Sequence, residues 1–261
     1  MTGHICVTVD NLGRAREVGL GEVYRPDRTE PGLEVGVPRM LGLFDELAIR
    51  TTFFVEGWNA LHHRDVLDSI LAEDHEIGLH GWVHENWAEL PEGQQERLLF
   101  DGTAAIRMAG ITPSGFRAPG GYRGSRTAAL LAELGYAYDS SVEPATEDDP
   151  LVVSLLPEGL VNIPWHWQSN DYWQYYMHPA GPQSPDQVLA SWRADLERVA
   201  HDDSLLTITV HPFVSGADAD KFSVLRAFLT EAACHPDLEV ITTGQLVARA
   251  RTAITAGPSP L

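Results

Sequence analysis

The feature of this sequence that most constrains its fold is a regular alternation between short apolar runs and longer amphipathic segments. Eight apolar runs have the length of buried strands, and six other segments carry apolar residues at three- and four-residue spacing. Alternating strands and helices build a mostly parallel sheet with the helices packed outside it. With about eight strands, we expect an α/β fold whose sheet curls into a distorted (β/α) barrel of seven or eight strands.

The predicted strands occupy residues 5–10, 51–56, 76–80, 114–119, 136–141, 159–164, 205–211 and 238–242. The predicted helices occupy residues 35–49, 63–74, 94–110, 125–135, 184–200 and 220–233. The sequence VDNLGRAR, at the end of the first strand, lacks the glycine spacing of a dinucleotide-binding loop. An open dinucleotide-binding sheet is therefore not expected.

Residues 142–184 depart from this alternation, since their helical pattern is weak and their aromatic density is high. Long irregular segments in compact domains are usually functional or disordered. The aromatic side chains argue against disorder and favour a loop that folds over the mouth of the barrel. They are Trp165, Trp167, Tyr172, Trp173, Tyr175 and Tyr176.

Length and composition indicate one domain, residues 1–261, because 44% of the 261 residues are hydrophobic and can form a sizeable core. The net charge of −19 argues against nucleic acid and anionic membranes as partners. Cys6 and Cys234 imply no disulfide framework, and Cys6 reads as a core thiol. The sequence shows no signal peptide and no apolar run of membrane-spanning length, so we expect a cytoplasmic protein, with homo-oligomerisation left open.

Ionisable side chains recur at the ends of the predicted strands. Asp10 ends the first strand, and His80 ends the third with His84 shortly after it. Arg117 lies in the fourth strand and His211 ends the seventh. Because the active sites of βα barrels form at the carboxyl ends of the strands, these residues predict one shared site.

Two neutral imidazoles and one carboxylate form a common site for a divalent metal that activates water and polarises a carbonyl group. Asp10, His80 and His84 are such a set. Zinc suits these ligands best, and iron, cobalt, nickel and manganese are compatible with them. The alternative is that the two histidines are only hydrogen-bonded loop residues.

Four short motifs follow one another between residues 7 and 211. They are VTVDN (7–11), HGWVH (80–84), RAPGGY (117–122) and TITVH (207–211). In order and rough spacing they resemble the motifs TFDDG, His-Ser/Thr-x-x-His, Arg-x-Pro-Tyr-Gly and a terminal apolar run ending in His. These are the motifs of the polysaccharide deacetylase superfamily, which comprises NodB-like carbohydrate esterases and their small-amide relatives. The resemblance implies a distorted (β/α) barrel and metal-dependent hydrolysis of an N-acyl bond.

The resemblance also implies roles for individual residues. His80 and His84 would bind the metal, and His211 would be the general acid that protonates the leaving amine. Arg117 would orient the catalytic carboxylate of Asp10. For substrate binding, the resemblance and the aromatic loop indicate the backbone N–H of Gly120, which would help to hold the oxyanion, with Tyr122, Trp165 and Trp167.

The first motif departs from the family, because Asp10-Asn11 replaces the usual pair of aspartates. In one alignment Asp10 is the base and Asn11 a neutral ligand through its carbonyl oxygen. In another, similar to relatives with Asp-x-Asp, Asp10 is the ligand and Thr8 occupies the base position. Asp10 is essential in both alignments.

The sequences His84-Glu85-Asn86 and HPFVSG (211–216) are similar to the branch that holds cyclic-imide hydrolases, allantoinase-like enzymes and peptidoglycan deacetylase relatives. The leading hypothesis is a metal-dependent hydrolase that deacetylates an N-acylated sugar or a related small molecule or oligosaccharide. Ring opening of a cyclic imide or ureide by the same residues is the first alternative. An inactive carbohydrate-binding relative, suggested by Asn11, is the second.

Overall fold

The computed structural model describes residues 2–142, 151–202 and 204–256, within which nine strands form one sheet. The strands are β1 (Gly3–Asp10), β2 (Thr52–Val55), β3 (Glu76–Leu79), β4 (Gly115–Phe116), β5 (Tyr138–Asp139), β6 (Ser154–Leu155), β7 (Val161–Asn162), β8 (Leu205–Val210) and β9 (Leu238–Val240). The α-helices are α1 (Ala15–Gly19), α2 (Val37–Glu46), α3 (Gly57–His62), α4 (Arg64–Ala72), α5 (Glu92–Met108), α6 (Thr127–Glu133), α7 (Pro185–Asp202), α8 (Ala219–Cys234) and α9 (Thr243–Ala256). Short 3₁₀ or π turns are η1 (Gly32–Gly36), η2 (Trp87–Glu89), η4 (Trp167–Ser169), η5 (Trp173–Met177) and η6 (Pro212–Gly216).

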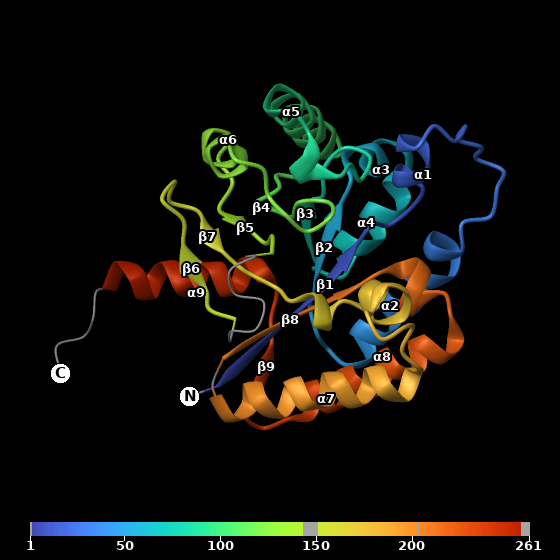
Figure 1. Ribbon diagram of the computed structural model, residues 1–261, viewed down its shortest axis with the longest axis vertical. Coiled ribbons are helices and arrows are strands. Elements are labelled where there is room, and N and C mark those ends of the chain that lie inside the picture. Colours follow the sequence, from blue (N-terminus) through green and yellow to red (C-terminus); the bar gives the residue numbers. More distant parts are fainter. Residues whose placement is uncertain (1, 143–150, 203, 257–261) are drawn as a thin grey trace.

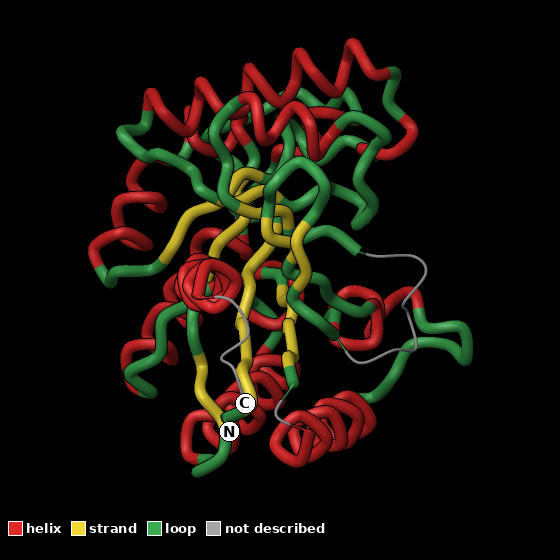
Figure 2. The backbone as a smooth tube through the Cα atoms, turned by 90° about the vertical axis from the view of Figure 1, so that its left-hand side faces the viewer, coloured by secondary structure: helices red, strands yellow, loops and turns green. Residues whose placement is uncertain are grey.

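The sheet is a curled half-barrel, with the strand order β6-β7-β5-β4-β3-β2-β1-β8 and with β9 also paired to β1 (Figures 1 and 2). All neighbouring strands are parallel except β6 and β7. Isolated bridges join Leu151 to Leu205 and Asn170 to Thr209, so the 151–170 segment returns to β8 and nearly closes the sheet. The expected distorted barrel is confirmed.

Strand β1 shows how the interior of the curled sheet is built, because alternate side chains of a strand point to opposite faces. Val7 and Val9 belong to the larger apolar core cluster. Cys6 belongs to a second apolar cluster, and Thr8 and Asp10 follow it along the same face of the strand. The interior therefore changes from apolar to polar toward the carboxyl end of β1.

Helices cover the outer faces of the sheet (Figure 1). Helices α7 and α8 lie side by side, and Trp192 of α7 contacts Phe228 of α8 with ring centroids 5.4 Å apart. Both rings are fully buried, as expected for the apolar stripes of amphipathic helices. Within the described residues, no helix combines the length and apolarity needed to cross a membrane.

All eight predicted strands and all six predicted helices form, although β4, β5 and β7 are shorter than expected. Four further elements, α1, α3, α9 and β6, lie outside the predicted ranges. Helices α1 and α3 have five and six residues, too few for a helical period to stand out. Of the irregular 142–184 segment, residues 143–150 lie outside the described residues, and the rest contains β6, β7, η4 and η5.

Candidate active site

A cavity of about 370 Å³ opens where the carboxyl ends of β1, β3 and β8 meet. Asp10 is the last residue of β1, and His80 and His211 directly follow β3 and β8. Seven of the predicted site residues line this cavity, namely Asp10, His80, His84, Gly120, Trp165, Trp167 and His211. Two others, Arg117 and Tyr122, do not line it and act on it through neighbours.

Arg117 is completely buried beneath the cavity and holds the Asp10 carboxylate. Its Nη1 donates to Asp10 Oδ1 at 3.0 Å and to Oδ2 at 3.2 Å. The same nitrogen donates to Thr8 Oγ1 at 2.7 Å and Thr209 Oγ1 at 3.0 Å. Nε and Nη2 donate to the carbonyl and hydroxyl oxygens of Ser140. These bonds fix the guanidinium and thereby the orientation of Asp10.

His80 and His84 face each other in the cavity, with ring centroids 5.0 Å apart. The Nδ1 of His80 hydrogen-bonds the Arg117 carbonyl oxygen at 2.9 Å, and its Nε2 lies 3.9 Å from Asp10 Oδ2. Burial, reinforced by nearby positive charges that include Arg16 for His84, lowers the pKa of each histidine to about 3. Both rings are therefore neutral at physiological pH, which is the form that binds metals.

Among the described residues, no three His, Cys, Asp or Glu side chains form a ready coordination shell. The 3.9 Å between His80 Nε2 and Asp10 Oδ2 compares with about 3.4 Å for two tetrahedral ligands that each lie about 2.1 Å from zinc. A shift of about half an ångström would close that gap. The backbone carbonyl on His80 Nδ1 is the outer partner that metal-binding histidines usually have. The chemistry of Asp10, His80 and His84 thus fits a divalent ion.

On the other side of the cavity, Asp171 holds His211. Asp171 Oδ1 lies 2.5 Å from His211 Nδ1, and Oδ2 accepts from the His211 backbone N–H at 2.9 Å. Ser215 Oγ donates to the same Oδ2 at 2.6 Å. Burial lowers the pKa of His211, but the charge and hydrogen bond of Asp171, with the charge of Asp10, raise it by more. His211 can therefore carry a proton near neutral pH with Nε2 free to donate it.

Gly120 has a φ of 75°, a left-handed conformation that favours glycine over the tyrosine that the family motif often has. A Cβ at this position would lie 3.2 Å from Asn86 Oδ1. Within the described part of the chain, no acceptor binds the Gly120 N–H. This N–H lies at the cavity and is suited to bind an oxyanion.

The aromatic loop forms one wall of the cavity. Trp165 and Trp167 lie edge to face, with ring centroids 4.8 Å apart, and the Arg117 guanidinium lies 5.4 Å from the Trp165 ring. The indole N–H of Trp167 donates to the Tyr122 hydroxyl at 3.0 Å, so Tyr122 supports the wall from behind. Among the described residues, the buried Trp165 Nε1 has no acceptor.

Asn11 has a φ of 56° and does not line the cavity that His80 and His84 line. With its amide nitrogen directed at Glu56, it donates to Oε1 at 3.0 Å and to the Gly13 carbonyl at 3.1 Å. The Nδ2 of Asn59 donates to the other Glu56 oxygen at 2.6 Å. Burial raises the pKa of Glu56 to about 8. This contact gives Asn11 a structural partner in place of the metal considered in the sequence analysis.

The substitution Asn11→Asp is expected to destabilise the protein by about 1–3 kcal/mol near pH 9, above the Glu56 pKa of about 8, because two carboxylates would then face each other without a proton between them. The loss should be smaller near pH 6, where protonated Glu56 can donate to the new carboxylate. Thermal unfolding of the variant and the wild type at both pH values measures the effect. Higher metal content in the variant with unchanged stability would instead indicate that Asn11 faces the metal.

Glu56, Arg16 and Asn170 also belong to this region of the structure, and none of them is among the site residues predicted from the sequence. Glu56 directly follows the buried strand β2, so the rule that selected His80 and His211 could have selected it. Arg16 and Asn170 line the cavity from the short helix α1 and from the irregular segment. No periodic pattern marks either position.

Comparison with known proteins agrees with this geometry. The sequence profile of the polysaccharide deacetylase family matches residues 29–138. A peptidoglycan deacetylase of Helicobacter pylori is 27% identical over 224 residues, which cover 73% of this chain and 76% of that protein.

Solved structures share the whole fold. A Mycobacterium smegmatis protein assigned to the polysaccharide deacetylases superposes with a TM-score of 0.85 and 29% identity, covering 100% of this chain and 93% of that one. PuuE allantoinase superposes with a TM-score of 0.81 and covers 98% of this chain and 92% of its own, and its 19% identity shows a common fold. In profile, sequence and fold, the chain is therefore similar to the polysaccharide deacetylase family, whose members act on C–N bonds, are typically metal-dependent and include peptidoglycan deacetylases.

Proposed function

We propose that this protein is a metal-dependent amidohydrolase that removes the acyl group from an N-acylated sugar or a related small molecule. The observation that carries the proposal is the pairing of two units across one cavity. Arg117 with Asp10 forms one unit, and Asp171 with His211 forms the other. A fixed carboxylate opposite a protonated imidazole suits hydrolysis, in which a proton is taken from water and another is given to the leaving group.

Asp10 is the proposed base. Its carboxylate is the acceptor that the site offers to an attacking water, and Arg117 prevents it from rotating away. Thr8, the alternative in one alignment, is fully buried, donates to the Ile208 carbonyl at 2.8 Å and accepts from Arg117. Its hydroxyl is therefore occupied as a structural partner of the arginine, and we assign proton removal to Asp10.

His211 and Gly120 act on the tetrahedral intermediate. The N–H of Gly120 binds the developing oxyanion in the cavity, one wall of which is formed by Trp165 and Trp167. His211 then protonates the departing nitrogen, while Asp171 stabilises the imidazolium and fixes its tautomer. A divalent ion held by Asp10, His80 and His84 would polarise the acyl carbonyl and acidify the attacking water.

Chelation is expected to reduce acyl release to background, and added zinc should restore it. His84→Gln should lower the metal content of the purified protein while its thermal stability stays near that of the wild type. His235→Gln, which changes a histidine outside the cavity, is the matched control and should keep both metal and activity. Full activity in metal-free protein, confirmed by elemental analysis, would contradict metal dependence.

A second candidate function is ring opening of a cyclic imide or ureide. The volume of about 370 Å³ and the aromatic wall of Trp165, Trp167 and Tyr172 suit one small ring. An acyl-release screen with N-acetylated sugars and oligosaccharides, run beside hydantoins and succinimide, separates the two candidates. Release of acetate supports the first, and consumption of only the cyclic compounds supports the second. If metal-loaded protein acts on neither class of compound, both candidate functions are wrong and a non-catalytic binding role is favoured.

A further inference from the structure

We propose that Arg16 binds a carboxylate on the substrate and so makes the protein selective for acidic N-acylated compounds. This inference rests on the proposed function, because it concerns the same bound substrate. Arg16 lies in α1, outside the four motifs that resemble those of the family.

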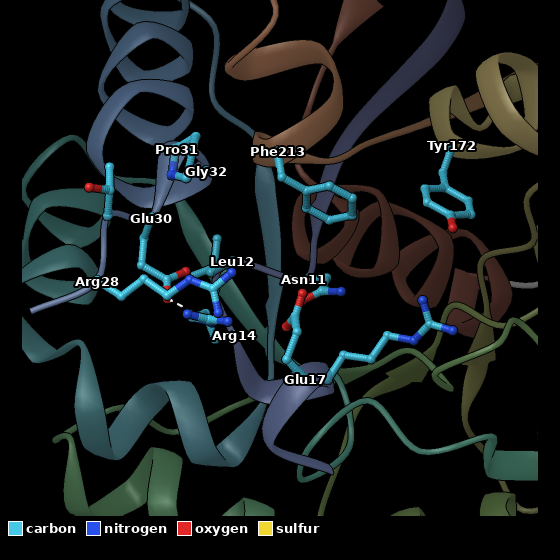
Figure 3. Close-up of a pocket in the computed structure, with 13 residues that line it drawn as sticks. Asn11, Leu12, Arg14, Glu17, Arg28, Glu30, Pro31, Gly32, Tyr172 and Phe213 are labelled. Atoms are coloured by element: carbon cyan, nitrogen blue, oxygen red, sulfur yellow. Dashed lines mark ion pairs between the residues drawn. The ribbon is translucent and has the colours of Figure 1, made fainter. Parts of the chain in front are cut away.

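A second cavity, of about 360 Å³, adjoins the active-site cavity, and Arg16 and Tyr172 line both. Figure 3 shows the rings of Phe213 and Tyr172 at one end of this second cavity and charged side chains, including Arg14 and Arg28, at the other. A ligand that extends out of the active-site cavity past Tyr172 therefore meets Arg16 at the junction.

The arginines of the second cavity differ in their partners. Arg14 forms ion pairs with Glu22 at 2.9 Å and Glu30 at 3.1 Å, and Arg28 lies 3.4 Å from Glu22. Among the described residues, the side chain of Arg16 forms no hydrogen bond or ion pair, and its backbone carbonyl accepts from the Leu20 N–H. Its guanidinium is thus available for a ligand, whereas the charges of Arg14 and Arg28 are already neutralised.

Helix α1 lies close to the loop between His80 and His84, which limits where Arg16 can reach. A Cβ at Gly19 would lie 2.9 Å from the Val83 side chain, so the helix packs directly against the segment between His80 and His84. This close approach places Arg16 at the rim of the active site. It also means that the helix cannot retreat without disturbing that loop.

The charge of the whole protein makes a local cation necessary for an acidic substrate. With a net charge of −19, the long-range field repels anions. A guanidinium can overcome this at short range, because it binds a carboxylate through two parallel hydrogen bonds. The neighbouring Glu17 also lines the second cavity, and a carboxylate there suits a sugar hydroxyl. The junction therefore fits a group that carries both a carboxylate and hydroxyls.

The test uses probe pairs of equal shape and different charge. N-acetylglucosamine carrying a carboxymethyl ether at O3 or O6 is compared with the uncharged carbamoylmethyl ethers. For whichever pair, O3 or O6, is hydrolysed faster, the wild-type protein is expected to have a higher kcat/KM for the acid than for the amide. Arg16→Gln should lower the acid-to-amide ratio by about 10- to 100-fold, mainly through KM, because charge-assisted hydrogen bonds are the stronger class. Arg16→Lys should recover part of the ratio, since it keeps the charge without the planar fork.

Arg126→Gln is the matched control, because Arg126 is exposed and lines neither cavity. It should leave the ratio at the wild-type value. If the wild type hydrolyses acid and amide equally and Arg16→Gln preserves that equality, the role of Arg16 is wrong while the proposed function stands. If the wild type hydrolyses neither, the proposed function fails, and calorimetric binding of the same probes decides the role of Arg16. Tighter binding of the acid that Arg16→Gln abolishes supports it, and equal binding overturns it.

Discussion

Asp10→Asn is expected to lower turnover by at least about 10³-fold, because the variant loses the carboxylate that we assign to accept the proton of water. Asparagine keeps the size of the side chain but cannot act as a base at neutral pH. Acyl release under metal-saturating conditions measures the loss. Metal content of the same variant separates the two roles of Asp10, since it falls if Asp10 is a ligand and persists if Asp10 is only the base.

The substitution also leaves the buried Arg117 without its counter-ion, so folding must be checked. Loss of one partner of a buried ion pair costs about 3–5 kcal/mol. Asp139→Asn is a matched control, because Asp139 is a fully buried carboxylate 2.6 Å from Arg123 and does not line the cavity. We expect a similar loss of stability and a much smaller loss of turnover. Full activity in Asp10→Asn would show that the site at the end of β1 is wrong.

His211→Ala is expected to reduce turnover by about 10²- to 10⁴-fold, the usual contribution of general acid catalysis. The effect should fall mainly on kcat, because the proton is transferred as the C–N bond breaks. It should shrink for substrates with activated leaving groups, which need less protonation. Turnover equal to that of the wild type with an unactivated amide would remove His211 from the mechanism.

The pH dependence follows from the same contact. His211 acts as an acid only when protonated, and Asp171 raises its pKa above the ordinary value of 6.5. Activity should therefore persist above pH 6.5 and decline as the pH rises through the raised pKa. The stability that this ion pair contributes is present below pH 6.5 and is lost across the same interval. Asp171→Asn should move the alkaline limb of the kcat profile to lower pH, which simple loss of folded protein would not do.

Much of the site could be predicted because parallel strands carry their carboxyl ends to one edge of the sheet. Asp10, His80 and His211 each end or directly follow a strand, so identifying the strands was enough to group them. The motif resemblance supplied roles for Arg117 and Gly120, which spacing alone would not assign. Glu56 obeys the same rule and was overlooked because it ends a run that reads as a plain core strand.

The pairing of Asp171 with His211 could not be predicted from the strand pattern in this way. It joins residues 40 positions apart, and Asp171 lies in the irregular segment. The Asn170–Thr209 bridge brings that segment back along β8 and thereby sets Asp171 against the imidazole. Tyr122 was assigned to substrate binding on the basis of its motif. In the structure it does not line the cavity, and its hydroxyl accepts from the Trp167 indole N–H. Loop geometry decides both cases, and loop residues carry no periodic signal.

The sequence by itself determined the curled α/β sheet and the cluster of Asp10, His80, His84 and His211. The reason is that hydrophobic periodicity and the alternation of strands and helices along the chain are local properties, and parallel strands bring their carboxyl ends to one edge. Only the tertiary structure decided the direction of side chains that leave the regular elements. Asn11 turns to Glu56 because its backbone is left-handed, and Arg16 reaches the junction of two cavities because α1 packs against Val83. Such directions depend on contacts between segments far apart in the chain, which no local pattern encodes.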